Sequence, residues 1–121
     1  MKLIIAGSRT LQASVEELCA LLGHFNLMPT EIVSGTAKGI DQCGEVLAKT
    51  VGVELKKFPA DWDQYGKVAG FKRNSQMAIY SDALLLIWDG ESKGSAHMKS
   101  AMTGLSKPIY EVVVKPNPKE D

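Results

Sequence analysis

The sequence has few of the residues that indicate a disulfide framework, a metal site or a membrane anchor. It contains 2 cysteines and 2 histidines among 121 residues, too few and too scattered for a metal-ligand motif. Cys19 and Cys43 fall on predicted apolar helix faces, where a free cysteine behaves as a small hydrophobic residue. No apolar run reaches membrane-spanning length, and residues 1–6 are too short for a secretory signal. We therefore predict no metal, no cofactor and no membrane partner, and a cytoplasmic location.

Net charge is also lacking. The 14 basic side chains balance the 14 acidic ones, so the formal net charge is zero. Proteins that coat nucleic acid depend on many neutralised phosphates, and this balance disfavours nucleic acid as a partner. The length and the 45% hydrophobic content are those of one globular domain. We predict a domain over residues 1–114 and a disordered polar tail over 115–121.

Short apolar runs alternate with segments of helical spacing along the chain. The runs are typical of buried parallel strands, and they predict strands over 3–6, 31–33, 53–58, 83–88 and 108–114. Four helices are expected between them: one capped by Ser14, one capped by Thr36, one over 69–81, and a last one starting at 94–95. Residues 60–67 show no period and are expected to form a long loop. This pattern predicts an α/β fold, a single Rossmann-like three-layer domain whose five-stranded parallel sheet has the order 3-2-1-4-5.

Glycines and polar residues follow the carboxyl ends of the predicted strands. In this strand order the winding direction reverses between strands one and four, where ligands of such sheets bind. We therefore expect one ligand site made by the residues that leave this edge. They are Gly7, Ser8, Arg9, Ser34, Gly35, Thr36, Lys38, Gly39, Asp41, Arg73, Asn74, Gly90, Gly94 and Ser95.

The stretch from Ser34 to Asp41 has the composition of a phosphate-binding turn. A strand that ends at a glycine-rich turn and restarts as a helix leaves N–H groups unpaired where the helix dipole favours an anion. Gly35 and Gly39 allow close approach of the backbone, and Lys38 adds a charge. The alternative is an ordinary strand-to-helix turn, because such short motifs often occur by chance.

The only two arginines of the chain, Arg9 and Arg73, are both expected near this edge. Arginine suits bidentate recognition of phosphate or carboxylate, so we expect both on the rim of the pocket; the alternative is two unrelated surface arginines. Gly94 and Ser95 begin the last helix and form a second candidate anion seat, or a plain helix cap.

The sequence also contains candidate catalytic carboxylates and candidate aromatic residues for stacking on a base, each with an ordinary structural alternative. Asp41 can accept a hydrogen bond from a ribose hydroxyl, and Asp89 and Glu91 can act as acid or base, although loop carboxylates are usually only solvated. Trp62 and Tyr65 can stack on a base, or they can pin the loop to the body of the protein.

Several of these stretches resemble a known superfamily. Residues 33–41, VSGTAKGID, resemble the SGxAxGID signature of the SMF/DprA proteins. Residues 71–74 (FKRN), 81–87 (SDALLLI) and 93–95 (KGS) resemble their RN, SDA and SGS elements in the same order. With the opening Gly7-Ser8-Arg9, residues 1–114 resemble the SLOG superfamily (SMF/DprA and LOG, Rossmann-like), most closely its short YspA-like or YpsA-related members.

The resemblance implies a Rossmann-like nucleotide pocket and several functions built on it. LOG enzymes hydrolyse the N-ribosidic bond of nucleoside monophosphates, DprA binds single-stranded DNA, and other SLOG domains are thought to sense or process nucleotide-derived signals. Related proteins commonly form dimers, so we expect a homodimer, with Met98, Met102 and Leu105 serving either the core or the interface.

One departure from the LOG pattern bears on catalysis. Arg73 matches the LOG arginine and Gly94-Ser95 match its Gly-Thr, but His97 and Met98 stand where LOG has its catalytic glutamates. We therefore favour a protein that binds a nucleotide, an ADP-ribose-like molecule or a related ribose phosphate. The alternatives are a LOG-like phosphoribohydrolase or another nucleotide hydrolase that uses Arg73, Asp41, Asp89 or Glu91, and, less favoured, DprA-like binding of single-stranded DNA.

Overall fold

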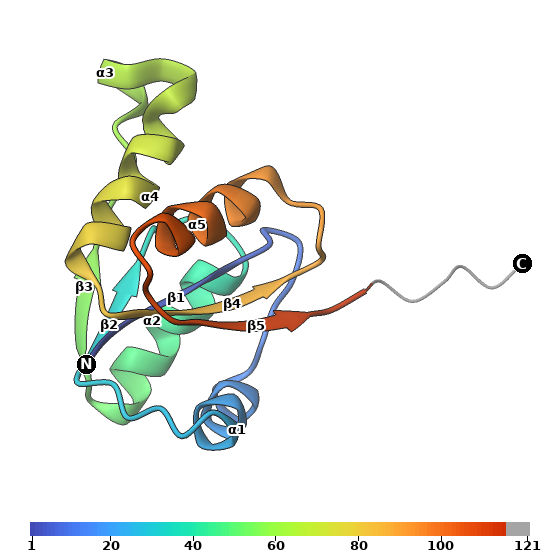
Figure 1. Ribbon diagram of the computed structural model, residues 1–121. Helices are drawn as coiled ribbons and strands as arrows, with labels where there is room; N and C mark the ends of the chain where they lie inside the picture. The colour runs from blue at the N-terminus through green and yellow to red at the C-terminus, as the bar shows by residue number, and fades with distance from the viewer. Residues whose placement is uncertain (116–121) are drawn as a thin grey trace, which may run out of the picture.

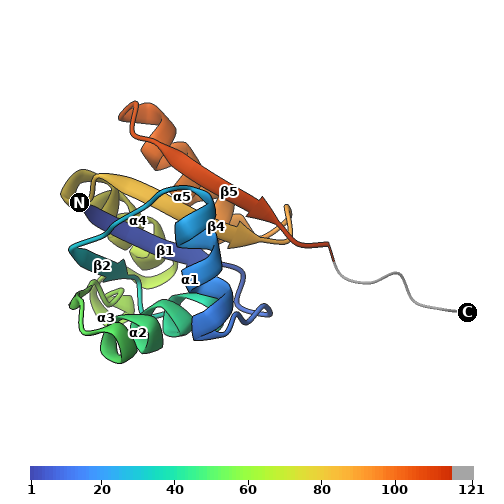
Figure 2. The ribbon, with the colours of Figure 1, turned by 90° about the horizontal axis from the view of Figure 1, so that it is seen from below.

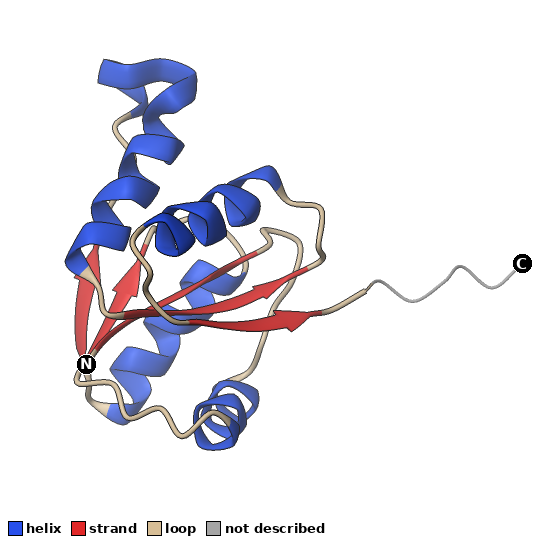
Figure 3. Ribbon diagram, viewed as in Figure 1, coloured by secondary structure: helices blue, strands red, loops and turns tan. Residues whose placement is uncertain are grey.

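Five parallel strands form one sheet in the order β3-β2-β1-β4-β5, as predicted. The computed structural model describes residues 1–115, and the rest of the predicted polar tail lies outside the described residues. Figures 1 and 3 show the strands side by side with helices on both faces. The strands are β1 (Lys2–Gly7), β2 (Glu31–Ser34), β3 (Glu54–Lys57), β4 (Ala83–Trp88) and β5 (Ile109–Val113).

Helices cover both faces of the sheet and make three layers. They are α1 (Val15–His24), α2 (Ile40–Val51), α3 (Trp62–Tyr65), the 3-10 helix η1 (Gly66–Val68), α4 (Ala69–Tyr80) and α5 (Lys93–Gly104). Figure 2 shows α1 and α2 on one face, with α4 and α5 behind the strands. This arrangement follows from right-handed crossovers between parallel strands on either side of β1.

The alternation of side chains along the central strands gives the protein two cores. Leu3 and Ile5 of β1 pack against the α1 and α2 face, whereas Ile4 and Ala6 pack against α4 and α5. All six residues of β4 are buried, as expected of a strand covered on both faces. The reversal of winding therefore lies at β1 and β4, and the two helix layers separate above their carboxyl ends.

Helix starts were predicted with mixed success. Ser14 caps α1 in a capping box: its Oγ accepts from the N–H of Glu17 at 3.0 Å, and Oε1 of Glu17 accepts from the N–H of Ser14 at 3.1 Å. The prediction that Thr36 caps α2 is wrong: the N-cap is Gly39. Gly39 has φ 77° and lies so close to the loop after β1 that a Cβ would be 2.5 Å from the carbonyl oxygen of Ser8, so this position requires glycine.

Two other expectations need correction. Residues 60–67 do not form an open loop: Asp61 caps the single turn of α3 by accepting from the N–H of Gln64 at 3.1 Å, and η1 continues it. Cys19 does not lie on a buried helix face; it is exposed, and Cys43 is half-buried. Within residues 1–115, the structure contains no helix with the length and apolar character needed to span a bilayer.

Candidate functional site

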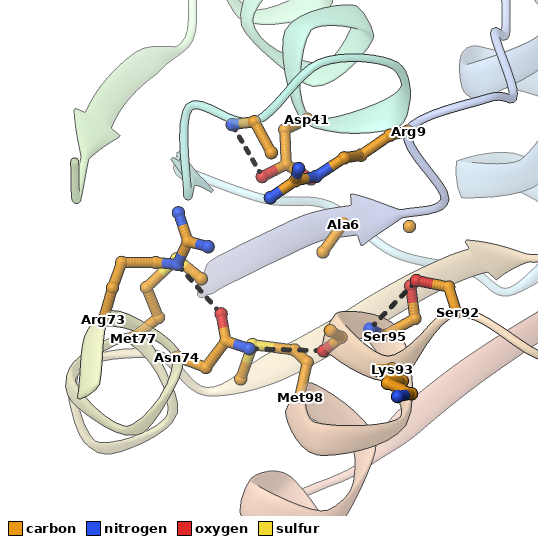
Figure 4. Close-up of a pocket in the computed structure, with 13 residues that line it drawn as sticks. Ala6, Arg9, Asp41, Arg73, Asn74, Met77, Ser92, Lys93, Ser95 and Met98 are labelled. Carbon is orange, nitrogen blue, oxygen red and sulfur yellow. Dashed lines mark hydrogen bonds between the residues drawn. The ribbon is translucent and has the colours of Figure 1, made fainter. Parts of the chain in front are cut away.

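A pocket of about 330 Å³ opens above the carboxyl end of β1, between α4, α5 and the loop before α2. Its floor is made by Ala6 and Gly7 of β1 with Met77 and Met98 from the two helices. Figure 4 shows charged and polar side chains around this floor. The pocket therefore lies where the strand order predicts a ligand site.

Two guanidinium groups border the pocket from different elements. Arg9 is exposed in the loop after β1, and Arg73 projects from α4. The carbonyl oxygen of Gly35 accepts from Nη1 of Arg73, and Oδ1 of Asn74 accepts from its Nε at 2.9 Å. Burial lowers the pKa of Arg73, the charge of Asp41 raises it, and the charge of Arg9 lowers it. A bound anion between the two arginines would favour their charged forms.

Asp41 supplies a buried carboxylate on the same pocket. It is 5% exposed, and its Oδ2 accepts from the N–H of Ala37 at 3.2 Å. Burial raises its pKa to about 6, although the Ala37 hydrogen bond and the charge of Arg73 act in the opposite direction. At neutral pH this carboxylate is largely ionised, and it can accept hydrogen bonds from ligand hydroxyls.

The first turn of α5 faces the pocket with hydrogen-bond donors. Ser92 is the N-cap and accepts from the N–H of Ser95 at 3.4 Å, whereas the N–H groups of Lys93 and Gly94 have no acceptor within the helix. The Ser95 side chain lines the pocket and is 4% exposed. Its Oγ has no hydrogen-bond partner among residues 1–115. A buried hydroxyl beside a helix N-terminus is available to donate to an anion.

Asn74 connects these two donor groups. Its Oδ1 binds Arg73, and its Nδ2 donates to the carbonyl oxygen of Gly94 at 3.2 Å. Figure 4 shows the amide lying between the guanidinium group and the start of α5. Asn74 is itself buried, and it therefore fixes Arg73 relative to the first turn of α5.

A smaller pocket of about 290 Å³ adjoins the first one and shares Arg9, Ala37 and Arg73 with it. Its remaining wall comes from Gly35, Thr36 and the segment after β3, including Pro59, Ala60 and Trp62. The two pockets thus follow the carboxyl edge of the sheet in opposite directions from the arginine pair.

No family model, curated protein or solved structure matches this chain. Its function is therefore inferred from the chemistry of the two pockets. That chemistry is a guanidinium pair, a helix N-terminus with an unpartnered hydroxyl, one buried carboxylate and one half-exposed indole.

Several predicted ligand residues instead hold the loops in place. Ser8 Oγ accepts from the N–H of Asp89 at 3.0 Å. Ser34 Oγ donates to Glu45 at 2.7 Å and accepts from the N–H of Thr36 at 3.1 Å. The N–H groups of Thr36 and Ala37 are therefore already paired, and the freer donors are those at the start of α5.

Other candidates lie away from the main pocket. Asp89 accepts from the N–H groups of Glu91 and Ser92 at 2.8 and 2.9 Å, which lowers its pKa and orders the turn before α5. Neither Asp89 nor Glu91 lines the pocket, and the same is true of Lys38, Gly39 and Gly90. Tyr65 lies under Lys72, whose Nζ is 4.4 Å from the ring centroid, on a different surface from Trp62.

The pocket also contains residues that sequence reasoning assigned elsewhere or passed over. Met98 lies on the predicted apolar face of the last helix, for core or interface, whereas Met77 has no predicted role; both pack in the core beneath α4 and α5. Ser92 and Lys93 fall in residues 90–95, which the sequence places at this edge, but only Gly90, Gly94 and Ser95 of that stretch are predicted ligand residues. His97 stacks on Phe71, with ring centroids 4.3 Å apart, and is not part of the pocket wall.

Proposed function

We propose that this protein binds a small phosphate-bearing nucleotide or nucleotide derivative in the pocket above β1, as a sensor or a processor of that ligand. The observation that carries the proposal is the convergence of Arg9, Arg73 and the first turn of α5, with the unpartnered Ser95 hydroxyl, on one cavity. Guanidinium groups and a helix N-terminus are both suited to phosphate. The resemblance of residues 1–114 to SLOG proteins supports the same proposal and membership of that superfamily.

A second candidate function, hydrolysis of the N-glycosidic bond, is favoured by one observation. Asp41 is the one carboxylate among the described residues that line the pocket, and its pKa of about 6 suits an acid or base at neutral pH. The LOG-like alternative would need Asp41 to replace the glutamates that His97 and Met98 do not supply. Binding without hydrolysis remains our first proposal.

Calorimetric titration with ribose 5-phosphate, AMP and ADP tests the proposal. We expect Arg9→Gln to weaken binding about tenfold or more, because a charge-assisted hydrogen bond contributes roughly 1.5–3 kcal/mol. Ser95→Ala should also weaken binding, and it should leave the melting temperature of the free protein unchanged or raised, since it removes an unpaired buried hydroxyl.

Ser81→Ala is the matched control. The Ser81 hydroxyl is also buried without a partner among residues 1–115, but it lies at the far end of α4 from the pocket. Ser81→Ala should therefore preserve binding. Equal affinity in wild type, Arg9→Gln and Ser95→Ala would refute the proposal. Chromatography of the titrated mixtures separates the two functions, because a binding protein returns its ligand intact.

A further inference from the structure

The two pockets adjoin along the carboxyl edge of the sheet and share three lining residues. The larger pocket lies over β1, between α4 and α5, and the smaller one lies beside the segments that follow β2 and β3. Arg9 and Arg73 belong to both. A ligand that engages the guanidinium pair therefore has space on either side of it.

The wall of the smaller pocket differs chemically from that of the larger one. It contains Trp62, Pro59 and Ala60, whereas none of the aromatic side chains in residues 1–115 lines the larger pocket. The indole is 51% exposed, and its edge lies so close to α4 that a Cβ on Gly70 would be 3.3 Å from Cη2. The absence of a side chain at Gly70 lets the ring lie against the helix with much of its surface open to solvent. A half-exposed indole beside cations is suited to a planar ring carried by an anion.

The larger pocket contains a second candidate anion-binding site, or seat, in addition to the arginine pair. That seat is the first turn of α5, and the buried Ser95 hydroxyl, which has no partner among residues 1–115, is independent evidence for it. A single amide side chain, that of Asn74, spans the gap between Arg73 and Gly94. One side chain therefore separates the two anion sites on the wall of the same pocket.

We propose that the ligand is a nucleoside diphosphate whose base stacks on Trp62, whose first phosphate lies between Arg9 and Arg73, and whose second phosphate binds the first turn of α5. This inference rests on the proposed function and specifies the ligand class. A nucleoside monophosphate leaves one seat empty, and inorganic pyrophosphate leaves the indole uncovered. ADP therefore binds more tightly than either.

Trp62 fluorescence and calorimetry together test this arrangement. The other tryptophan, Trp88, is 8% exposed and donates from Nε1 to Glu111 at 2.7 Å, so it gives a constant background. We expect ADP to change the emission of wild type and pyrophosphate to leave it unchanged. ADP should bind at least tenfold more tightly than AMP. Trp62→Leu should weaken ADP binding about fivefold or more and preserve pyrophosphate affinity, and Trp62→Phe should retain most ADP affinity.

Tyr65→Leu is the matched control, because Tyr65 belongs to the same short helix but faces another surface. It should leave ADP affinity unchanged. If Trp62→Leu also leaves it unchanged while Arg9→Gln weakens it, the base does not lie on Trp62 and this inference is wrong, although the proposed function stands. AMP binding as tightly as ADP would overturn the two-phosphate arrangement. Absence of binding by every probe would overturn the proposed function and this inference together.

Discussion

At the scale of single residues, Asp41 couples the site to pH. An aspartate in an unfolded chain has a pKa of about 3.9, whereas burial raises that of Asp41 to about 6 in the folded protein. Between these values the folded chain holds a proton that the unfolded chain has released. The contribution of Asp41 to stability therefore falls as pH rises from about 4 to about 6.

We predict that Asp41→Asn becomes increasingly stabilising, relative to wild type, as pH rises through this window. The asparagine can still accept from the N–H of Ala37, but it removes the cost of burying a charge. From the linkage relation, the difference in unfolding free energy should grow by about 2 kcal/mol between pH 4.5 and 7.5. Urea unfolding of both proteins at the two pH values measures it.

The exposed Asp63→Asn is the comparison for that experiment. Its stability relative to wild type should differ little between the two pH values. If Asp41→Asn behaves in the same way, the carboxyl group of Asp41 is not desolvated as the structure indicates.

Site residues could be predicted from the sequence where they directly follow a strand or begin a helix, because those positions lie at the carboxyl edge of the sheet. Arg9, Asp41, Gly94 and Ser95 follow strand ends or begin helices, and the structure places all four on the main pocket. Ser8, Ser34 and Thr36 follow the same rule, yet their side chains or N–H groups are paired within the loops. Which polar groups stay unpaired depends on loop geometry, and sequence spacing does not contain that information.

At the scale of elements, the end of α4 depends on a lysine that comes much later in the chain. Nζ of Lys107 donates to the carbonyl oxygens of Ala78, Ile79 and Ser81 at 2.7, 3.0 and 2.7 Å. The last carbonyls of a helix lack partners within it, and a cation there is also favoured by the helix dipole. Lys107 thereby joins the end of α4 to the segment before β5.

We predict that Lys107→Met lowers the free energy of unfolding by about 2 kcal/mol. Methionine keeps much of the aliphatic length but leaves the three carbonyl groups, two of them half-buried, without their charged donor. Urea denaturation monitored by circular dichroism measures the loss. Lys38→Met is the control, because Lys38 is exposed and has no hydrogen bond within residues 1–115. An equal change in the two variants would contradict the capping role.

Strands and long helices could be predicted because their apolar pattern repeats over several residues. The six-residue run of β4 and the stripe of α5 are examples. By contrast, α3 has four residues, too few to show a period, and its capping by Asp61 is visible only in the structure. The Lys107 contact was likewise beyond sequence reasoning, since it joins residues more than twenty-five positions apart.

At the scale of the whole molecule, the strand order explains why the two pockets meet. The crossovers from β1 to β3 place α1 and α2 on one face, and those from β3 to β5 place α4 and α5 on the other. The helix layers therefore diverge at β1 and β4, where the main pocket opens. Arg73 reaches this edge from α4, and Arg9 reaches it from the loop after β1. The two cations of the pocket therefore come from two different elements.

The outer surface of α4 and α5 is the face on which we expect the homodimer to form. Met98 and Met102 are buried in the core, whereas Leu105 is 45% and Ile79 is 70% exposed. These two side chains border a groove of about 310 Å³ whose other lining residues are small and uncharged: Ser75, Ala78, Ser100, Ala101 and Gly104. The groove itself therefore contributes no charged side chain to such an interface.

We predict that wild type sediments as a dimer and that Leu105→Glu sediments as a monomer, because an unpaired carboxylate in an apolar interface is costly. None of the groove residues lines the main pocket, so ligand binding by Leu105→Glu should persist unless the second copy completes the site. Val46→Glu is the control, since Val46 is 54% exposed on α2, on the opposite face of the sheet. A monomeric wild type, or a Leu105→Glu protein that remains dimeric, would exclude this face as the interface, and equilibrium sedimentation distinguishes these outcomes directly.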